Sequence, residues 1–255
     1  MKYSIDFKVA EKRMLSDNFF RLALQSENPL PTINPGQFVQ ILPKHSNGLR
    51  LPISINDVVS DNIIYLLIRI VGSGTKMLAD IEQGETVNMI LPLGNGFPML
   101  SADELRKGKR ILMVGGGVGI APFLHLAKEY AKCGITTDVL LGARTEKHIL
   151  LEKELSQTAN LHIATEDGSC GTKGLITAHE ILKEHFDRIY CCGPLPMMKA
   201  VASVVADKSK CYVSLEERMA CGVGACLCCV VKTADGHNRC TCTEGPVFGV
   251  DFLGW

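Results

Sequence analysis

The chain has 255 residues, of which 46% are apolar and 21% charged, enough apolar sequence for a buried core and too much for wholesale disorder. The 27 basic and 27 acidic residues balance, which argues against nucleic acid or an anionic membrane as the main partner. No apolar run approaches the roughly 18 residues of a membrane span, and the first residues contain no signal-peptide core. We therefore expect a cytoplasmic protein of two or three domains.

Residues 1–100 are predicted to form β structure. Short apolar and β-branched stretches, such as Phe38–Leu42 and Ile63–Val71, alternate with turn signals. The turn signals are Asn34-Pro35-Gly36, Ser46-Asn47-Gly48 and Gly94-Asn95-Gly96. Several short strands at this spacing favour a small barrel or sandwich.

From about residue 101 to residue 209, short apolar strands alternate with helical stretches. Residues 110–114 form the first such strand, a glycine-rich loop follows at 115–119, and a helical stretch runs from Ala121 to Lys132. This alternation predicts a parallel sheet covered by helices on both faces, as in a Rossmann-like α/β domain. After about residue 210 the regular pattern stops.

The loop Gly115-Gly116-Gly117-Val118-Gly119 joins a strand to a helix, where free backbone N–H groups can meet a phosphate. It departs from the strict dinucleotide fingerprint because Pro122 occupies the third glycine position, and a tight turn without a ligand is the alternative. Two further loops, 165–169 and 192–197, follow strand ends at the same edge of the sheet. All three can therefore face one crevice.

Charged residues near these loops bear on the choice of coenzyme. Glu166 and Asp167 would repel a 2′-phosphate and could accept hydrogen bonds from ribose hydroxyls, which favours NAD over NADP. Arg144, after the second strand, argues the other way. Solvated loop charge is the alternative for both.

Six of the eleven cysteines lie within residues 221–242. A disulfide framework is not expected in a reducing compartment. Cys221, Cys226 and Cys229 follow the pattern C-x4-C-x2-C, with Cys242 further on, which is the spacing of plant-type [2Fe–2S] ferredoxins. The glycines between the first two cysteines allow the backbone to fold tightly around a compact cluster. We therefore predict an iron–sulfur site.

A structural zinc site is the alternative, although zinc usually takes two pairs of ligands and three candidates here fall in one tight loop. Cys240 competes with Cys242 on spacing alone, whereas Cys228 would break the spacing. The other cysteines are most simply packed or free thiols: Cys133, Cys170, Cys191 and Cys211.

Over essentially its whole length the sequence resembles the electron-transfer subunits of dihydroorotate dehydrogenase B, iron–sulfur flavoproteins of the ferredoxin-reductase superfamily. The most specific stretches are residues 214–226 (SLEERMACGVGAC) and 242–248 (CTEGPVF). The resemblance implies a Greek-key FAD-binding β-barrel over 1–100, a Rossmann-like NAD-binding domain over 101–209 and a small [2Fe–2S] domain over 210–255. It also makes Cys242, rather than Cys240, the expected fourth ligand.

Residues 51–54 (LPIS) resemble the family's flavin motif Arg-Pro-Ile-Ser, but Leu51 stands where the family has an arginine that neutralises flavin phosphate. Arg50 precedes it, and adjacent side chains of a strand point to opposite faces, so Arg50 could substitute only with a local twist or bulge. Arg69 could carry part of the charge, and solvation of both arginines is the alternative. By resemblance, FAD contacts are expected from Leu51, Pro52, Ile53, Ser54, Leu67, Ile68, Arg69, Gly74 and Thr75.

The same resemblance places Cys192 beside the nicotinamide, where a small thiol would not block hydride transfer; an ordinary strand-end cysteine is the alternative. NAD contacts are expected from Gly115, Gly116, Gly117, Gly119, Glu166, Asp167, Cys192 and Gly193.

The resemblance implies an oxidoreductase subunit of pyrimidine (UMP) biosynthesis. Electrons would pass between an FMN-containing catalytic subunit, which oxidises dihydroorotate, and NAD+ through the [2Fe–2S] cluster and FAD. The expected assembly is a heterotetramer of two catalytic and two electron-transfer chains, with part of the tail buried between them.

Two other functions compete with this interpretation. One is a related NAD(P)H-linked flavin/[2Fe–2S] reductase subunit serving a hydrogenase or a ferredoxin-dependent transhydrogenase. The other is a sensor or binding protein whose cysteine-rich tail holds zinc.

Overall fold

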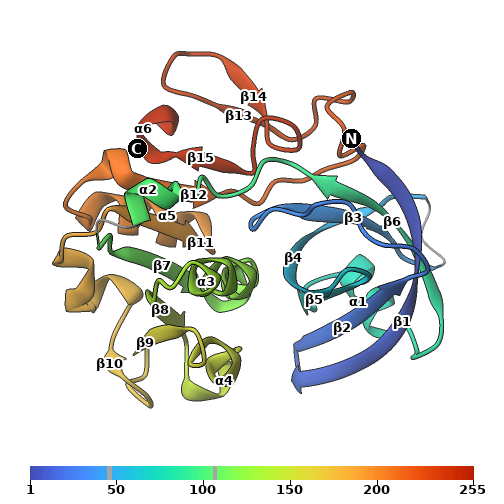
Figure 1. Cartoon of the computed structure of the whole chain (residues 1–255), viewed down its shortest axis with the longest axis horizontal. Helices are drawn as coiled ribbons and strands as arrows, with labels where there is room; N and C mark the ends of the chain where they lie inside the picture. Colours follow the sequence, from blue (N-terminus) through green and yellow to red (C-terminus); the bar gives the residue numbers. More distant parts are fainter. Residues whose placement is uncertain (45–47, 106–107) are drawn as a thin grey trace.

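The computed structural model describes residues 1–44, 48–105 and 108–255. A β-barrel and an α/β unit lie side by side, and the C-terminal segment runs across the top of both (Figure 1). The turn expected at Ser46-Asn47-Gly48 lies largely outside the described residues. Within the described ranges, no helix has the length and apolarity needed to cross a bilayer.

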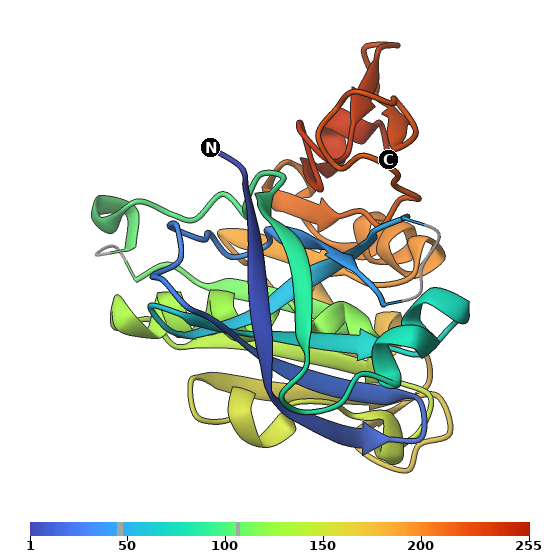
Figure 2. The same ribbon diagram turned by 90° about the vertical axis from the view of Figure 1, so that its right-hand side faces the viewer.

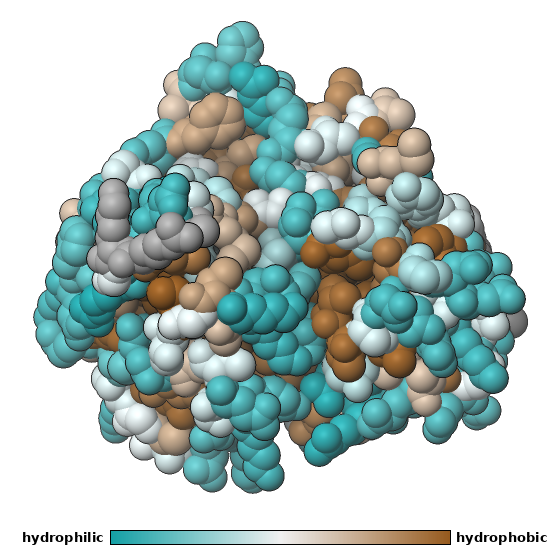
Figure 3. Space-filling model, in the orientation of Figure 1, coloured by the Kyte–Doolittle hydropathy of each residue, from teal (hydrophilic) through white to brown (hydrophobic). Residues whose placement is uncertain are grey.

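The N-terminal unit is a closed antiparallel barrel with the strand order β1–β2–β5–β4–β3–β6, which confirms the predicted barrel. Its elements are β1 (Tyr3–Ser16), β2 (Phe19–Ser26), β3 (Phe38–Leu42), β4 (Leu51–Ser60), β5 (Ile63–Arg69), α1 (Ser73–Ala79) and β6 (Thr86–Leu93). Alternate residues point inward, so Val39 and Ile41 of β3 join the barrel core. Apolar residues show at the surface around β4 and β5 (Figure 3).

The second unit is a seven-stranded sheet in the order β10–β9–β8–β7–β11–β12–β15, parallel except for β15. Separate apolar clusters cover its two faces, as the continuous apolar runs predicted. Its strands are β7 (Ile111–Gly116), β8 (Thr137–Ala143), β9 (Ala159–Thr165), β10 (Thr172–Lys173), β11 (Arg188–Cys192), β12 (Cys211–Ser214) and β15 (Val247–Gly249).

Helices and 3₁₀ turns connect these strands. The helices are α2 (Ala102–Leu105), α3 (Phe123–Lys132), α4 (Glu152–Leu155), α5 (Leu195–Val204) and α6 (Val250–Leu253). The 3₁₀ turns are Gly117–Ile120, Glu146–His148, Ile176–Ala178, Glu180–Lys183 and Lys208–Lys210.

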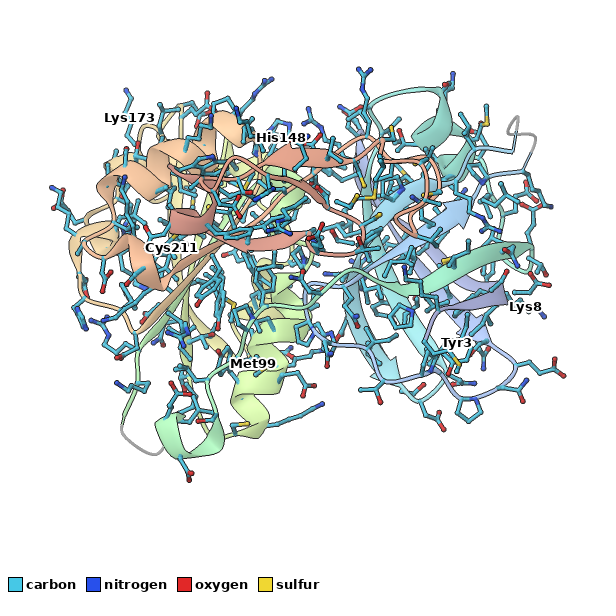
Figure 4. All side chains as sticks on the ribbon, turned by 90° about the horizontal axis from the view of Figure 1, so that it is seen from above. Tyr3, Lys8, Met99, His148, Lys173 and Cys211 are labelled. Carbon is cyan, nitrogen blue, oxygen red and sulfur yellow. The ribbon has the colours of Figure 1, made fainter. Side chains whose placement is uncertain are left out.

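The C-terminal tail is tied into this sheet at both ends. It leaves the sheet after β12 and returns in β15, and the Leu215 N–H donates to the Pro246 oxygen at 2.9 Å across the base. Between these points lies the small hairpin β13 (Val230–Lys232) and β14 (Asn238–Cys240). The tail stands above both units in the rotated view (Figure 2). Cys211 begins β12 over the α/β unit, and the tail crosses from that side toward the barrel (Figure 4).

Direct contacts fix the barrel against the α/β unit. The Asn56 side chain on β4 donates to the Ala121 oxygen at 2.7 Å, and the buried Asp57 carboxylate pairs with Lys128 of α3. Arg21 of β2 pairs with Glu154 of α4 at 3.0 Å. The crevice between the two units therefore has fixed walls.

Asn95, in the predicted Gly94-Asn95-Gly96 turn, holds the base of the tail. Its Nδ2 donates to the oxygens of Glu244 and Val247 at 3.0 and 2.9 Å, and its Oδ1 accepts from the Val247 N–H at 3.0 Å. A Cβ built at Gly94 would lie 2.5 Å from Pro246 Cδ and 2.9 Å from Phe38 Cε1. This turn thus brings barrel, sheet and tail together.

We expect Asn95→Ala to loosen the base of the tail, because three hydrogen bonds to the tail backbone are lost. The free energy of unfolding should fall by about 1–2 kcal/mol, and backbone amides within residues 215–246 should exchange with solvent faster. Hydrogen-exchange mass spectrometry measures both effects. Asn160→Ala, at an exposed asparagine of β9, is the matched control, and equal exchange in the two variants would contradict the assigned role.

Candidate active site

Two adjoining pockets occupy the crevice between the units. One, of about 630 Å³, lies against the barrel; the other, of about 680 Å³, lies at the carboxyl edge of the parallel sheet. Arg69, Val118 and Glu216 line both pockets. Ligands held in the two pockets would therefore meet at this shared wall.

The barrel pocket contains most of the residues predicted to contact flavin. Those in its lining are Leu51, Pro52, Ile53, Ser54, Leu67, Ile68, Arg69 and Thr75. Gly74 lies behind Leu51, because a Cβ built at Gly74 would be 2.9 Å from both Leu51 δ-carbons. The Thr75 hydroxyl is engaged within its own turn, where it accepts from the Val71 and Gly72 N–H groups.

The pocket contains cations although Leu51 replaces the family's arginine. Arg50 lines it alongside Arg69 and Arg218. Arg50 Nη1 donates to the oxygens of Gln40 and Asn88, each at 3.1 Å, and burial lowers the pKa of its guanidinium. Leu51 instead packs against the barrel core. An apolar wall beside three guanidinium groups fits a flat aromatic ring that carries phosphates.

The second pocket is built around the glycine-rich loop. Gly116, Gly117, Gly119 and Gly193 line it, and Gly117 has a left-handed φ of +55°. A Cβ built at Gly119 would lie only 2.3 Å from the Cys192 oxygen, so this position needs glycine for the two loops to approach. Gly115 lies outside the lining, and its Cβ position faces Ile120 at 2.7 Å. The predicted meeting of these loops at one crevice is present in the fold.

Glu166, Arg144 and His148 lie along the same pocket. Asp167 lies outside the lining, where its carboxylate accepts from the Ser169 N–H at 3.0 Å and hydroxyl at 2.7 Å. These two bonds lower the Asp167 pKa. Of the two predicted acidic residues, Glu166 is therefore the one placed to meet a ligand.

Cys192 is buried at the end of β11, immediately before the lining residue Gly193. Desolvation raises the pKa of its thiol, and the nearby Glu216 raises it further. The thiol therefore stays neutral and uncharged against the pocket wall.

Glu216 is a pocket residue that sequence reasoning did not single out, although it lies within the SLEERMACGVGAC stretch. The residue is exposed and lines both pockets. Desolvation raises its pKa, and Arg69 opposes that shift. Glu216 thus places a protonatable group at the wall shared by both pockets.

The four predicted cluster ligands come together in two pairs. The Cys226 thiol lies against the Cys221 sulfur, and the Cys229 thiol against that of Cys242. Among the described residues, no three Cys, His, Asp or Glu side chains converge on a single metal-ion site. Two pairs of cysteines fit a [2Fe–2S] cluster, in which two cysteines hold each iron.

Backbone N–H groups of the glycine-containing loop surround these sulfurs. The N–H groups of Val223 and Cys226 each donate to Cys221 Sγ at 3.4 Å, which lowers the Cys221 pKa to about 6. Burial raises the pKa of Cys242 to about 12. The backbone of the loop therefore favours the thiolate form of Cys221.

The rival cysteines have different surroundings. Cys240 is buried with Cys229 and Cys242 in one cluster, and desolvation raises its pKa. Cys228 is exposed, and its thiol donates to the Arg218 oxygen at 3.5 Å. None of the eleven cysteines, all of which are described, forms a disulfide.

Comparison with known proteins finds family models for two stretches of the chain. Residues 216–253 match the model for the iron–sulfur cluster binding domain of dihydroorotate dehydrogenase B, and residues 113–203 match the oxidoreductase NAD-binding domain. Among solved structures, one described as an NADH-dependent reduced ferredoxin-NADP oxidoreductase has a TM-score of 0.83 at 28% identity, covering 98% of this chain and 90% of that chain. The cytochrome b5 reductase domain of Ulva prolifera nitrate reductase has a TM-score of 0.66 at 18% identity, covering 83% and 97%, and shows the shared fold alone.

Two curated relatives carry the name "dihydroorotate dehydrogenase B (NAD(+)), electron transfer subunit". The protein from Lysinibacillus sphaericus is 41% identical over 94% of this chain and 95% of its own length. The protein from Fusobacterium nucleatum is 37% identical over 95% of each chain. With this identity over nearly the full length, the chain belongs to the family of dihydroorotate dehydrogenase B electron transfer subunits.

Proposed function

We propose that this chain passes electrons between a dihydroorotate-oxidising catalytic subunit and NAD+ by way of a [2Fe–2S] cluster and FAD. The observation that carries this proposal is the continuity of the three sites. The two pockets share a wall at Arg69, Val118 and Glu216, and Phe38 both lines the barrel pocket and packs with Cys229 and Cys242.

We assign FAD to the barrel region 1–100, NAD to region 101–209 and the cluster to region 210–255. FAD, when bound, supplies the conversion between two-electron exchange with a nicotinamide and one-electron exchange with an iron–sulfur cluster. Arg50, Arg69 and Arg218 neutralise its phosphates, and Pro52 with Ser54 form the barrel wall beside its ring. Arg50 takes over the charge that Leu51 does not provide.

Gly116, Gly117 and Gly119 allow a dinucleotide to approach the backbone closely, and Gly193 forms the facing loop. Cys192 closes the wall behind the nicotinamide with a neutral, weakly polar thiol, since its pKa is raised by burial. Glu216 places an ionisable carboxylate at the shared wall, where desolvation raises its pKa. No described feature provides a dihydroorotate site in this chain, and that chemistry is assigned to the partner.

Coenzyme choice is expected to depend on Glu166. Replacing Glu166 by glutamine removes a negative charge from the pocket wall and should raise kcat/KM for NADPH relative to NADH by about tenfold, since removing about 1.4 kcal/mol of repulsion gives that factor. Steady-state kinetics with both coenzymes measures the ratio. Asp167→Asn changes the neighbouring carboxylate outside the lining and is the matched control; an equal effect in both variants would contradict the assignment.

We further propose a partner subunit that carries FMN, in an assembly of two catalytic and two electron-transfer chains acting in pyrimidine synthesis. Support comes from the exposed face of the cluster loop, where Cys226 lies beside the exposed apolar side chains of Val223 and Leu227. Burial of these side chains against a partner would bring the cluster close to it. We also propose a cytoplasmic location, because a chain with eleven cysteines and a cluster-binding domain suits a reducing compartment.

Co-purification with the candidate catalytic subunit, followed by a dihydroorotate-to-NAD+ assay, tests the function. The proposal expects a stable complex, flavin absorbance and iron–sulfur absorbance that dithionite bleaches. The similarity to the ferredoxin-NADP oxidoreductase structure favours a transhydrogenase subunit as the second candidate. A complex that reduces NAD+ from reduced ferredoxin but not from dihydroorotate would establish that candidate instead, and a colourless protein containing zinc would exclude both.

A further inference from the structure

A buried side-chain amide lies between the barrel and the cluster loop without a partner. Gln40, in the middle of β3, has 0% of its surface exposed. Within the described part of the chain, neither its Nε2 nor its Oε1 has a hydrogen-bond partner. A buried unpaired amide is costly, so we expect a group at this place that pairs with it when the protein is complete.

The direction of the Gln40 side chain identifies that place. Val39 and Ile41 point into the barrel core, so Gln40 and Phe38 point outward from β3. The outer face of this strand is covered by the cluster loop. A Cβ built at Gly222 would lie 2.6 Å from Gln40 Cγ and 3.0 Å from Nε2, so the amide contacts the residue that directly follows Cys221.

The sulfur of Cys221 already accepts hydrogen bonds from backbone N–H groups on one side. The Val223 and Cys226 N–H groups reach Cys221 Sγ from within the loop. The barrel side of the same loop presents the Gln40 amide, which has two N–H donors. Gly222 permits this contact because it has no side chain and its φ is +67°.

We propose that Gln40 Nε2 donates a hydrogen bond to a sulfur of the [2Fe–2S] cluster on its Cys221 side and thereby raises the reduction potential of the cluster. This inference rests on the proposed function, in which the four cysteines hold the cluster. An added electron increases the negative charge on the sulfurs, so a donor stabilises the reduced cluster more than the oxidised one.

Gln40 also connects the cluster to the flavin pocket. Its backbone oxygen accepts the hydrogen bond from Arg50, and its strand neighbour in register is Pro52, both of which line that pocket. A residue that contacts the cluster loop and supports the flavin wall fixes the two sites relative to each other. Gln40 is therefore a positioning and tuning residue, not a catalytic one.

Replacing Gln40 by leucine in the complex with its partner subunit tests the proposal. We expect the midpoint potential of the cluster, measured by a redox titration followed by electron paramagnetic resonance, to shift to lower values while iron and sulfide content stay unchanged. The FAD absorption spectrum should be retained. Gln25→Leu, on the exposed face of β2, is the matched control and should leave the potential unchanged.

Gln40→Glu keeps the shape but replaces the NH₂ donor by an oxygen, and it should also lower the cluster potential. If either variant loses the cluster, the wild-type complex with glutamine labelled at the side-chain nitrogen by ¹⁵N still decides the question. A hyperfine coupling between that nitrogen and the reduced cluster supports the bond, and its absence overturns it. Unchanged cluster potentials in both variants, or a shift confined to FAD, would also overturn the proposal. A wild-type protein with no iron–sulfur cluster would instead refute the proposed function.

Discussion

Cys226→Ser is expected to stop electron transfer from dihydroorotate to NAD+. The variant should still bind FAD and should still oxidise NADH when an artificial dye is the electron acceptor. Cys226 supplies one sulfur of the first pair, and its N–H donates to Cys221 Sγ. Loss of this sulfur removes a ligand from one iron, so the rate in the complex should fall by about 100-fold or more. Iron content and the two activities, measured on the same preparation, give the result.

Cys228→Ser provides a closely matched control. Cys228 lies two residues away in the same loop and is also exposed, but it points to the Arg218 oxygen rather than to another sulfur. We expect this variant to retain the cluster and the rate. Comparing Cys240→Ser with Cys242→Ser identifies the fourth ligand, because both thiols pack near Cys229 and the Cys242 thiol interacts with it directly. Loss of the cluster in Cys240→Ser alone would show that the pairing is wrong.

Gly119→Ala should weaken NADH binding without removing FAD or the cluster. The added carbon would lie 2.3 Å from the Cys192 oxygen and 2.6 Å from Gly193 Cα, so two strand-end loops must separate to accommodate it. Overpacking of this kind costs about 1–3 kcal/mol, which corresponds to a Kd or KM for NADH higher by about 5- to 150-fold. Isothermal titration and steady-state kinetics measure these values.

Gly72→Ala is the control for a glycine-to-alanine change in a loop of the same protein. No heavy atom lies within 4 Å of a Cβ built at Gly72, and its φ of −163° is extended backbone that any residue adopts. We expect normal NADH binding in this variant. Normal NADH binding in Gly119→Ala would mean that the two loops need not approach each other when the coenzyme binds.

The architecture was largely predictable because its signals are local. Apolar strands with alternating or continuous patterns, and glycines at turns, predicted the barrel and the parallel sheet. The sequence does not predict strands β12 and β15, because segments of four and three residues are too short for a periodic pattern to be recognised. Their place in the sheet depends on pairing with β11 and with each other, which is tertiary information.

The candidate site was predictable where spacing carries chemistry and less so where geometry decides. The cysteine spacing predicts four cluster ligands, which stay a prediction, and the structure groups these cysteines into two pairs. Glu216 and Gln40 have no distinctive spacing, and their interest comes only from what lies beside them. The sequence predicts that Arg50 can compensate for Leu51 only with a local twist or bulge, and in the structure both residues line the barrel pocket.

The pairing of β12 with β15 makes the cluster segment an insertion between adjacent strands rather than an appended end. Its entry and exit at Leu215 and Pro246 are joined by a hydrogen bond, so its length and content can change without altering the order of the sheet. In principle such a segment can be replaced. A different electron-transfer segment could be inserted between the same two strands while the nucleotide-binding parts stay unchanged. The choice of electron acceptor can thus evolve separately from the choice of electron donor.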